Sequence, residues 1–157
     1  MSGACIAEYT ARVVVTGAAG RLGGKIAAAL RATGRHVIAI DRAPEPSGPA
    51  PRAWDEYVQC DLAGAYKGDA RTALVEAVEG ADAVVHCAAW PGPSATPPPA
   101  VSLELGTQAA RSIGLETIAP GRILRDNLAM THALCDIAVE ARVRRFVFSS
   151  TAFAMGW

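Results

Sequence analysis

Short apolar runs alternate with longer amphipathic stretches along most of this chain. Short apolar, mostly β-branched runs predict strands at 12–16, 36–40, 57–60, 83–87 and 145–149, of which 12–16 and 36–40 are expected to be buried. Apolar residues at helical spacing predict helices at 22–33, 69–79 and 122–141. Strands separated by crossover helices indicate an α/β fold, a doubly wound parallel Rossmann sheet with strand order 3-2-1-4-5. We interpret residues 1–157 as one such domain.

The first two predicted helices each have an apolar side that is expected to pack on the sheet. These inward positions are Leu22, Ile26 and Leu30 in the first helix, and Leu74, Val75 and Val78 in the second. Gly34 is expected to end the first helix, because glycine adopts the left-handed conformation common after a helix C-terminus.

Two proline-rich segments interrupt this alternation. Residues 43–51 contain four prolines and residues 91–99 contain five, so neither segment can form a ladder or a helix interior. Both follow strands of the predicted sheet, and the carboxyl ends of parallel strands form its ligand-binding edge. Two interpretations stay open: mobile linkers, or flaps over a cofactor and a substrate. Weak helical spacing at 100–118 predicts an extra helix, so we treat 90–120 as an insertion or flap.

Composition and charge exclude several classes of partner. The chain is 51% hydrophobic and 19% charged, which is typical of a globular protein and not of a disordered one. Its formal net charge is zero, so no bulk field attracts nucleic acid or an anionic membrane. No signal-like N-terminus and no apolar run of membrane-spanning length is present. We therefore expect a cytoplasmic protein with no nucleic-acid and no membrane partner.

The four cysteines do not suggest a metal site. Cys5, Cys60, Cys87 and Cys135 form no C-x-x-C pair, and no histidine cluster accompanies them. We expect reduced core thiols and no bound metal.

A glycine-rich loop, T-G-A-A-G-R-L-G at 16–23, directly follows the first predicted strand. Gly17 permits a tight turn off the strand, and Gly20 allows a pyrophosphate to approach the backbone. Gly23 allows the following helix to pack closely on the sheet. Phosphates would then meet the N–H groups at the positive end of that helix. The alternative is a tight strand–helix turn without a ligand.

Two carboxylates follow later strands. Asp41 lies eighteen residues after Gly23, where it can accept hydrogen bonds from the adenosine ribose hydroxyls. It would repel a 2′-phosphate and so favours NAD over NADP, whereas Arg42 can pair with such a phosphate. The alternative for Asp41 is a turn-capping aspartate. Asp61 can accept from the adenine amino group while Leu62 packs the ring, or it is an ordinary loop carboxylate.

Three further sequence motifs occur in the same order along the chain as in a known family. They are H-C-A-A at 86–89, R-D-N-L at 125–128, and the strand R-F-V-F-S followed by Ser150 and Thr151. With the glycine loop, Asp41 and Asp61, they make the chain resemble the NAD-dependent epimerase/dehydratase family, the extended short-chain dehydrogenases.

The resemblance implies a role for each matched position, with NAD as the cofactor and NADP disfavoured. The implied cofactor-binding residues are Gly17, Ala19, Gly20, Arg21, Leu22 and Gly23 around the pyrophosphate, Asp41 and Arg42 at the adenosine ribose, Asp61 and Leu62 at the adenine, and Ala88, Ala89, Ser149 and Ser150 towards the nicotinamide. Asn127 would anchor a helix kink or touch the cofactor. Thr151 is the implied catalytic residue, whose hydroxyl donates to a substrate oxygen. We interpret His86 as a satisfied histidine at a strand end.

The match is incomplete at the family's catalytic base, a tyrosine in a Y-x-x-x-K motif. Tyr9, Tyr57 and Tyr66 each lack a lysine four residues later, and Met155 stands where the family often has tyrosine. Without such a base, a loss of about 10²–10⁴-fold in rate is expected. The chain would act on a sugar or nucleotide-sugar only if missing residues complete it. The alternatives are a non-catalytic NAD(P)-binding sensor or regulatory module, and a scaffold with an empty glycine loop.

The absence of further strands and of a substrate domain from this sequence also affects assembly. The fifth predicted strand would form an open sheet edge carrying Val147 and two phenylalanines. Such an edge invites pairing with another chain, so we expect a homo-oligomer through it.

Overall fold

The computed structural model describes residues 10–47, 51–90 and 120–150. Five strands form one parallel sheet: β1 (Arg12–Thr16), β2 (His36–Asp41), β3 (Glu56–Gln59), β4 (Ala83–His86) and β5 (Arg145–Phe148). The strand order is β3-β2-β1-β4-β5, which confirms the predicted Rossmann topology. In register, Val14 of β1 lies between Ile38 of β2 and Val84 of β4.

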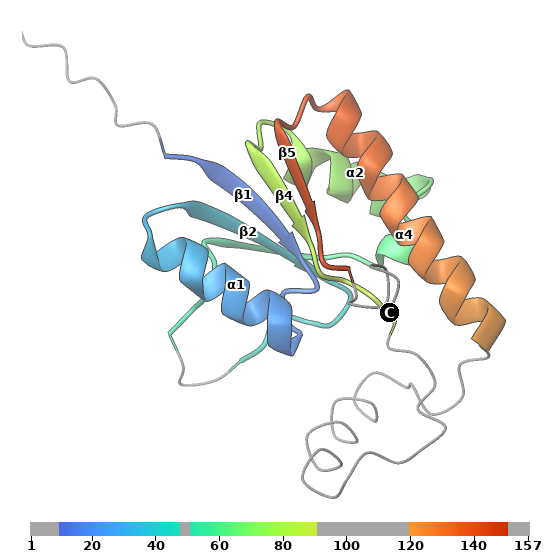
Figure 1. The fold of residues 1–157 in the computed structure, drawn as a ribbon, viewed down its shortest axis with the longest axis horizontal. Coiled ribbons are helices and arrows are strands. Elements are labelled where there is room, and N and C mark those ends of the chain that lie inside the picture. Colours follow the sequence, from blue (N-terminus) through green and yellow to red (C-terminus); the bar gives the residue numbers. More distant parts are fainter. Residues whose placement is uncertain (1–9, 48–50, 91–119, 151–157) are drawn as a thin grey trace, which may run out of the picture.

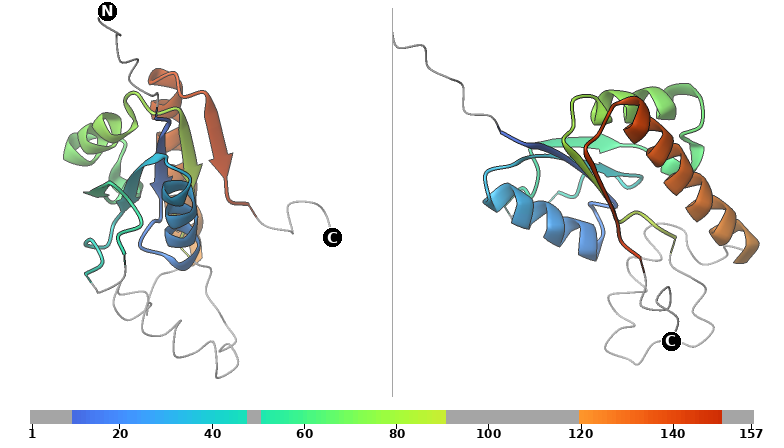
Figure 2. Two further views of the ribbon diagram at one scale, coloured as in Figure 1. Left: turned by 90° about the vertical axis from the view of Figure 1, so that its left-hand side faces the viewer. Right: turned by 45° about the horizontal axis from the view of Figure 1, so that its top comes forward.

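Helices cover both faces of the sheet (Figures 1 and 2). The helix α1 (Arg21–Ala32) packs on one face, and α2 (Gly68–Val78) and α4 (Pro120–Glu140) pack on the other. A short 3₁₀ helix, η1 (Leu62–Gly64), follows β3. The extra helix expected at 100–118 and the proline-rich segment 91–99 lie outside the described residues. No helix in the described part of the chain is long and apolar enough to cross a membrane.

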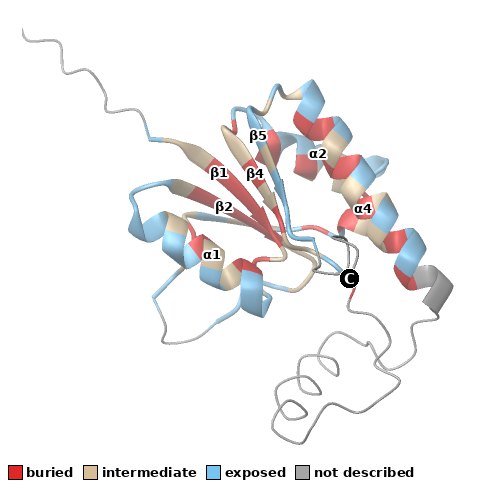
Figure 3. Ribbon diagram, in the orientation of Figure 1, coloured by how far each residue is buried: buried red, intermediate tan, exposed pale blue. Residues whose placement is uncertain are grey.

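The core consists of two layers, one on each face of the sheet, because alternate strand residues point to opposite faces. Val14, Ile38 and Ile40 pack with α2 and α4, whereas Val13 and Val15 pack on the α1 side. Both faces of the central strands are therefore buried, as Figure 3 shows. This explains why these strands appear in the sequence as continuous apolar runs.

Two of the expected inward positions are wrong. Leu22 is 52% exposed and Val75 is 37% exposed. The buried face of α1 consists of Gly23 and Ala27, with Ile26 packing beside them. These small residues bring the helix so close to the glycine turn that a large side chain has no room there.

The buried face of the second helix, α2, also differs from the expected one. Its buried face is Leu74, Ala77 and Val78, at the i, i+3, i+4 spacing of one helical side. Val75 lies beside this face, so its apolar character alone does not place it in the core.

Candidate nucleotide-binding site

A cavity of about 780 Å³ opens at the carboxyl edge of the sheet. Its size lies within the range of roughly 300–1,000 Å³ typical of ligand pockets. The predicted cofactor-binding residues that line it are Gly17, Ala19, Gly20, Asp41, Arg42, Asp61, Leu62, Ala88 and Ala89. The fold thus brings predicted residues that follow four different strands together at one cavity.

Other predicted site residues do not line this cavity. Arg21 and Leu22 are exposed on the first turn of α1, Gly23 is buried beneath it, and Ser149 and Ser150 are exposed after β5. Asn127 lies on α4 and contacts the segment after β4. The implied catalytic residue Thr151 lies outside the described residues.

The glycine turn depends on the absence of side chains. Gly17 adopts φ +70°, and its N–H donates to the Ile40 carbonyl at 2.8 Å. A Cβ at this position would lie 2.7 Å from the Ala88 nitrogen and 2.8 Å from the Cys87 carbonyl carbon. Gly17 therefore serves both the turn and the close approach of the segment after β4.

Gly20 and Gly23 have different roles. A Cβ at Gly23 would lie 2.2 Å from the Gly17 carbonyl oxygen, so this glycine allows α1 to pack against the turn rather than on the sheet itself. At Gly20 the nearest atom is the same oxygen at 3.1 Å, and the residue is exposed at the cavity. Gly20 is also the N-cap of α1, with no capping side chain and no acidic residue in the first turn. The positive end of the helix thus faces the cavity without an acidic residue in its own first turn.

Asp41 connects two of the surrounding loops. One carboxylate oxygen accepts from the Ala19 N–H and the other from the Ala43 N–H, both at 3.0 Å. Asp41 therefore does cap the turn, as the alternative interpretation expects. Each oxygen retains a lone pair, so capping the turn does not prevent Asp41 from accepting ribose hydroxyls in the cavity that it lines.

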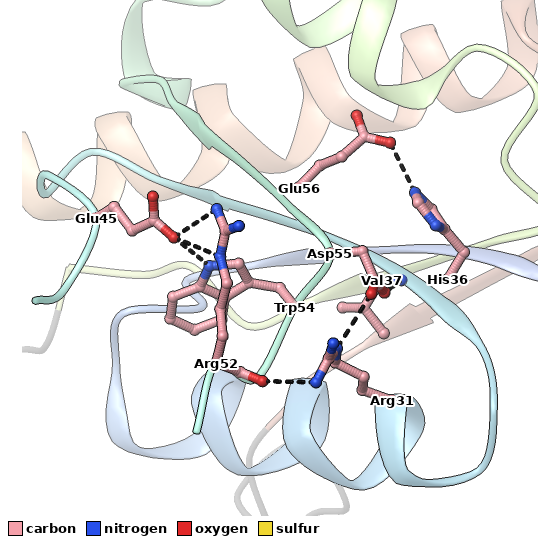
Figure 4. A network of polar contacts seen from close by, with 8 residues as sticks. All are labelled: Arg31, His36, Val37, Glu45, Arg52, Trp54, Asp55 and Glu56. Atoms are coloured by element: carbon pink, nitrogen blue, oxygen red, sulfur yellow. Dashed lines mark hydrogen bonds and ion pairs between the residues drawn. The ribbon is translucent and has the colours of Figure 1, made fainter. Parts of the chain in front are cut away.

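The proline-rich loop after β2 is fixed by side-chain contacts (Figure 4). Glu45 accepts from the Trp54 indole N–H at 2.7 Å and pairs with Arg52 at 2.8 Å. The hydrogen bond from Trp54 and the nearby Arg52 charge hold the pKa of Glu45 below its ordinary value. The Tyr57 hydroxyl donates to the Ala43 carbonyl at 2.8 Å. Residues 43–47 thus form part of the cavity wall, which favours the flap interpretation over a free linker.

The segment after β3 supplies the opposite wall. Asp61 caps η1 by accepting from the Ala63 N–H at 3.1 Å, and its side chain remains exposed. Leu62 is buried but contributes to the cavity lining. This exposed carboxylate beside an apolar surface fits the predicted adenine contact.

The described cysteines are free thiols, although only Cys60 is fully buried. Cys87 and Cys135 are half-buried, and burial raises the pKa of all three. Cys5 lies outside the described residues. Cys60 and Cys87 line the cavity, but a raised pKa disfavours the thiolate form that nucleophilic chemistry requires. Within the described residues, no group of three or more His, Cys, Asp or Glu side chains is arranged to hold a metal.

A buried histidine links β1, β4 and α4 behind the cavity. His86 is 1% exposed, and burial lowers its pKa to about 4. Its Nε2 lies 3.2 Å from the Thr131 hydroxyl, which itself donates to the Asn127 carbonyl at 2.9 Å. The hydroxyl therefore accepts from Nε2–H, and Nδ1 of the neutral ring accepts from the Thr16 hydroxyl at 2.7 Å. The expectation of a satisfied histidine is confirmed.

Asn127 and Trp90 fix the segment after β4. The Asn127 side chain accepts from the Trp90 N–H at 2.7 Å and donates to the Trp90 carbonyl at 3.1 Å. The Trp90 indole is buried, and the Arg42 guanidinium stacks on it with 3.8 Å between its carbon and the ring centre. Asn127 thus positions the cavity wall through the backbone of another residue.

Several cavity residues were not predicted from the sequence. They are Ala43, Pro44, Pro46, Cys60, Cys87, Trp90 and Met130, with Thr16 supporting them from β1. Trp90 could have been suspected because it directly follows the paired alanines at 88–89. Met130 carries no local signal, since it reaches the cavity only through the packing of α4.

The parallel sheet, the glycine turn after β1 and the cavity at its carboxyl edge define a Rossmann-type domain. The family model for "NAD dependent epimerase/dehydratase family" matches residues 13–101, so the chain belongs to this family. A comparison with curated proteins gave no match.

Solved structures share this fold. A short-chain dehydrogenase/reductase superfamily protein from Agrobacterium tumefaciens, solved with NAD, is 32% identical with a TM-score of 0.59, over 89% of this chain and 32% of that protein. A variant of uronate dehydrogenase from the same organism, complexed with NAD, is 26% identical with a TM-score of 0.60, over 91% and 42%. MoeE5, solved with UDP-glucose and NAD, is 28% identical with a TM-score of 0.59, over 90% and 36%. The chain thus spans about a third to two fifths of the length of these proteins.

Proposed function

We propose that this chain is the NAD-binding part of an NAD-dependent epimerase/dehydratase-type oxidoreductase that acts on a sugar or nucleotide-sugar. The observation that carries the proposal is the cavity in which the bare backbone of Gly17 and Gly20 and the carboxylate of Asp41 face one space. Backbone without Cβ atoms accommodates a pyrophosphate, and a carboxylate accepts from ribose hydroxyls. The residues present therefore fit NAD.

Each wall of the cavity is proposed to bind a different part of NAD. Gly17, Ala19 and Gly20 would surround the pyrophosphate, with Arg21 and Leu22 at the helix end beyond them. Asp41 and Arg42 would hold the adenosine ribose, and Asp61 and Leu62 the adenine. Ala88 and Ala89 would lie towards the nicotinamide, followed by Ser149 and Ser150. Asn127 would act through the backbone of Trp90, which it holds by two hydrogen bonds.

The reaction itself is proposed from the family. NAD, when bound, supplies a two-electron hydride acceptor. The Thr151 hydroxyl would donate to a substrate oxygen. The Y-x-x-x-K base of the family is not among the 157 residues, so we propose that turnover requires residues that this sequence does not contain. The sugar class follows from relatives: one is named a uronate dehydrogenase and another was solved with UDP-glucose.

A second candidate function is a non-catalytic NAD(P)-binding module that senses redox state or regulates a partner. The cavity supports it as well, because binding the cofactor needs no catalytic base. A turnover assay on uronates and nucleotide-sugars separates the two functions: product formation supports the enzyme, and NAD binding without turnover by this chain supports the module. A cytoplasmic location stays a prediction for either function.

Calorimetric titration with NAD and NADP tests the binding proposal. We expect NAD to bind at sub-millimolar concentration and more tightly than NADP. Gly20→Leu, which places a side chain at the cavity, should weaken binding at least about tenfold, or about 1.4 kcal/mol. Ala29→Leu adds a comparable side chain on the exposed side of α1 and should leave affinity unchanged. Absence of binding to both nucleotides at millimolar concentration would overturn the proposal.

A further inference from the structure

Arg42 and Trp90 meet across the carboxyl edge of β1. Arg42 directly follows β2 and Trp90 lies after β4, and β1 separates these two strands in the sheet. The guanidinium carbon lies 3.8 Å from the centre of the indole ring. We propose that Trp90 is a positioning residue that holds Arg42 in this stack, and that the stack sets the discrimination between NAD and its 2′-phosphorylated form. The inference rests on the proposed function of NAD binding.

Trp90 is a fixed platform and not a loose surface ring. Its backbone N–H and carbonyl both bind the side chain of Asn127, at 2.7 and 3.1 Å. Its indole is 8% exposed and packs in the core layer that includes Met130 and Leu62. Arg42 therefore stacks on a buried residue whose backbone is held by two hydrogen bonds.

The stack is of the stronger kind of cation–π contact. The guanidinium carbon lies over the ring, and tryptophan presents the most favourable face among the aromatic residues. The interaction strengthens when water is excluded, and the buried indole meets that condition. Moving Arg42 away from Trp90 therefore carries a cost that any competing anion must offset.

Asp41 and Arg42 leave the end of β2 on opposite sides. The Asp41 carboxylate points to the glycine turn and accepts from Ala19, whereas Arg42 points to the layer that contains α4 and Trp90. A ribose bound at Asp41 thus meets the carboxylate first, and a 2′-phosphate there would need Arg42 to leave the indole.

The consequence is a bias in affinity. NAD places only hydroxyls at Asp41, so it binds with the stack intact. NADP brings a phosphate that Asp41 repels and that Arg42 can neutralise only after unstacking. Loss of the aromatic face removes the stacking contribution that holds Arg42 on the indole, and the affinity for NADP relative to NAD should then rise by about tenfold.

Titration calorimetry of the full chain with NAD and with NADP tests this inference through the ratio of the two affinities. Trp90→Leu keeps apolar bulk but removes the aromatic face, and it should raise the NADP:NAD ratio about tenfold. Trp90→Phe keeps a weaker aromatic face and more of the packing, and should give a smaller rise. In the Arg42→Gln background, Trp90→Leu should leave the ratio unchanged.

The ratio separates a positioning role from a merely structural one. If Trp90 served packing alone, its replacement would weaken both nucleotides equally, and an unchanged ratio in Trp90→Leu and Trp90→Phe would overturn the inference. A rise of equal size in the Arg42→Gln background would overturn it as well. If the unsubstituted chain bound neither nucleotide, the proposed function would fail and the inference with it. If the unsubstituted chain binds NAD but replacing Trp90 does not change the NADP:NAD affinity ratio, the inference fails and the proposed function stands.

Discussion

The two sides of the sheet differ in how their loops meet the cavity. On the β1–β3 side, Asp41 ties the glycine turn to the loop after β2, and Tyr57 of β3 ties that loop in turn. On the β5 side, the Ser149 N–H donates to the His86 carbonyl, but Ser149 and Ser150 are exposed and do not line the cavity. Among the described residues, the side predicted for adenosine is enclosed by these linked loops, whereas on the side predicted for nicotinamide only Ala88 and Ala89 line the cavity.

This difference separates holding a cofactor from using it. An adenosine site needs a bare turn, a carboxylate and an apolar wall, and the described residues supply all three. Hydride transfer also needs groups that polarise the substrate and move a proton. The proposed group of that kind, Thr151, lies outside the described residues.

The largest expected effect comes from filling the glycine turn. Gly17→Ala introduces a Cβ 2.7 Å from the Ala88 nitrogen at φ +70°. Strain and overpacking together should lower the free energy of unfolding by roughly 3 kcal/mol. Gly34→Ala is the matched control, since Gly34 has φ +77° but nothing within 4 Å of its Cβ position. It should cost only about 1 kcal/mol in denaturant titration. Equal losses in both variants would show that the contact with the segment after β4 contributes nothing.

The second prediction concerns pH and the β4 side. Burial lowers the pKa of His86 to about 4 from 6.5, so the unfolded chain binds more protons between these values. The stabilisation from neutral His86 is complete above pH 6.5 and is lost as the pH falls towards 4. The free energy of unfolding should therefore fall by roughly 3 kcal/mol over this window.

Denaturant titration across pH checks the assignment. His86→Gln should flatten the profile between pH 6.5 and 4, whereas His132→Gln, at an exposed position on α4, should leave it unchanged. The assignment to His86 fails if its replacement keeps the full pH dependence.

The third prediction concerns the enclosed side alone. Asp41→Ala removes two hydrogen bonds that join the loops and the proposed acceptor for the ribose. NAD affinity should fall about tenfold or more, or about 1.4 kcal/mol. Asp69→Ala removes an exposed carboxylate in the first turn of α2, away from the cavity lining, and should not change affinity. Retention of full affinity by Asp41→Ala would break the proposed ribose contact.

The smallest effect is expected at the open sheet edge. Among the described strands β5 pairs only with β4, and Val147 and Phe148 are 52% and 51% exposed. We propose a homo-oligomer through this edge, and Val147→Lys should shift light scattering at high concentration towards the monomer by a few-fold change in dissociation constant. Val139→Lys, on the exposed side of α4, is the control. A monodisperse monomer before substitution, or dissociation by Val139→Lys instead, would argue against the β5 edge.

Sequence patterns predicted the sheet because the central strands β1, β2 and β4 are runs rich in β-branched residues, each followed by a recognisable break. They predicted Gly17 because a glycine motif with a physical requirement precedes a helix, and Asp41 because a carboxylate stands at the end of the next strand. They misplaced Leu22 because apolar periodicity assumes that large residues face inward, whereas here Gly23 must bring α1 against the turn. Met130 could not be predicted, because it reaches the cavity through the packing of α4. The stack of Arg42 on Trp90 could not be predicted either, because it joins two distant loops.

The central claim is that the enclosed side carries the affinity for NAD. Calorimetric titration with NAD, ADP-ribose and nicotinamide mononucleotide tests it most directly. We predict that ADP-ribose binds within about threefold of NAD and that nicotinamide mononucleotide shows no binding at millimolar concentration. Binding of nicotinamide mononucleotide as tight as that of ADP-ribose, or no binding of ADP-ribose at all, would contradict the claim.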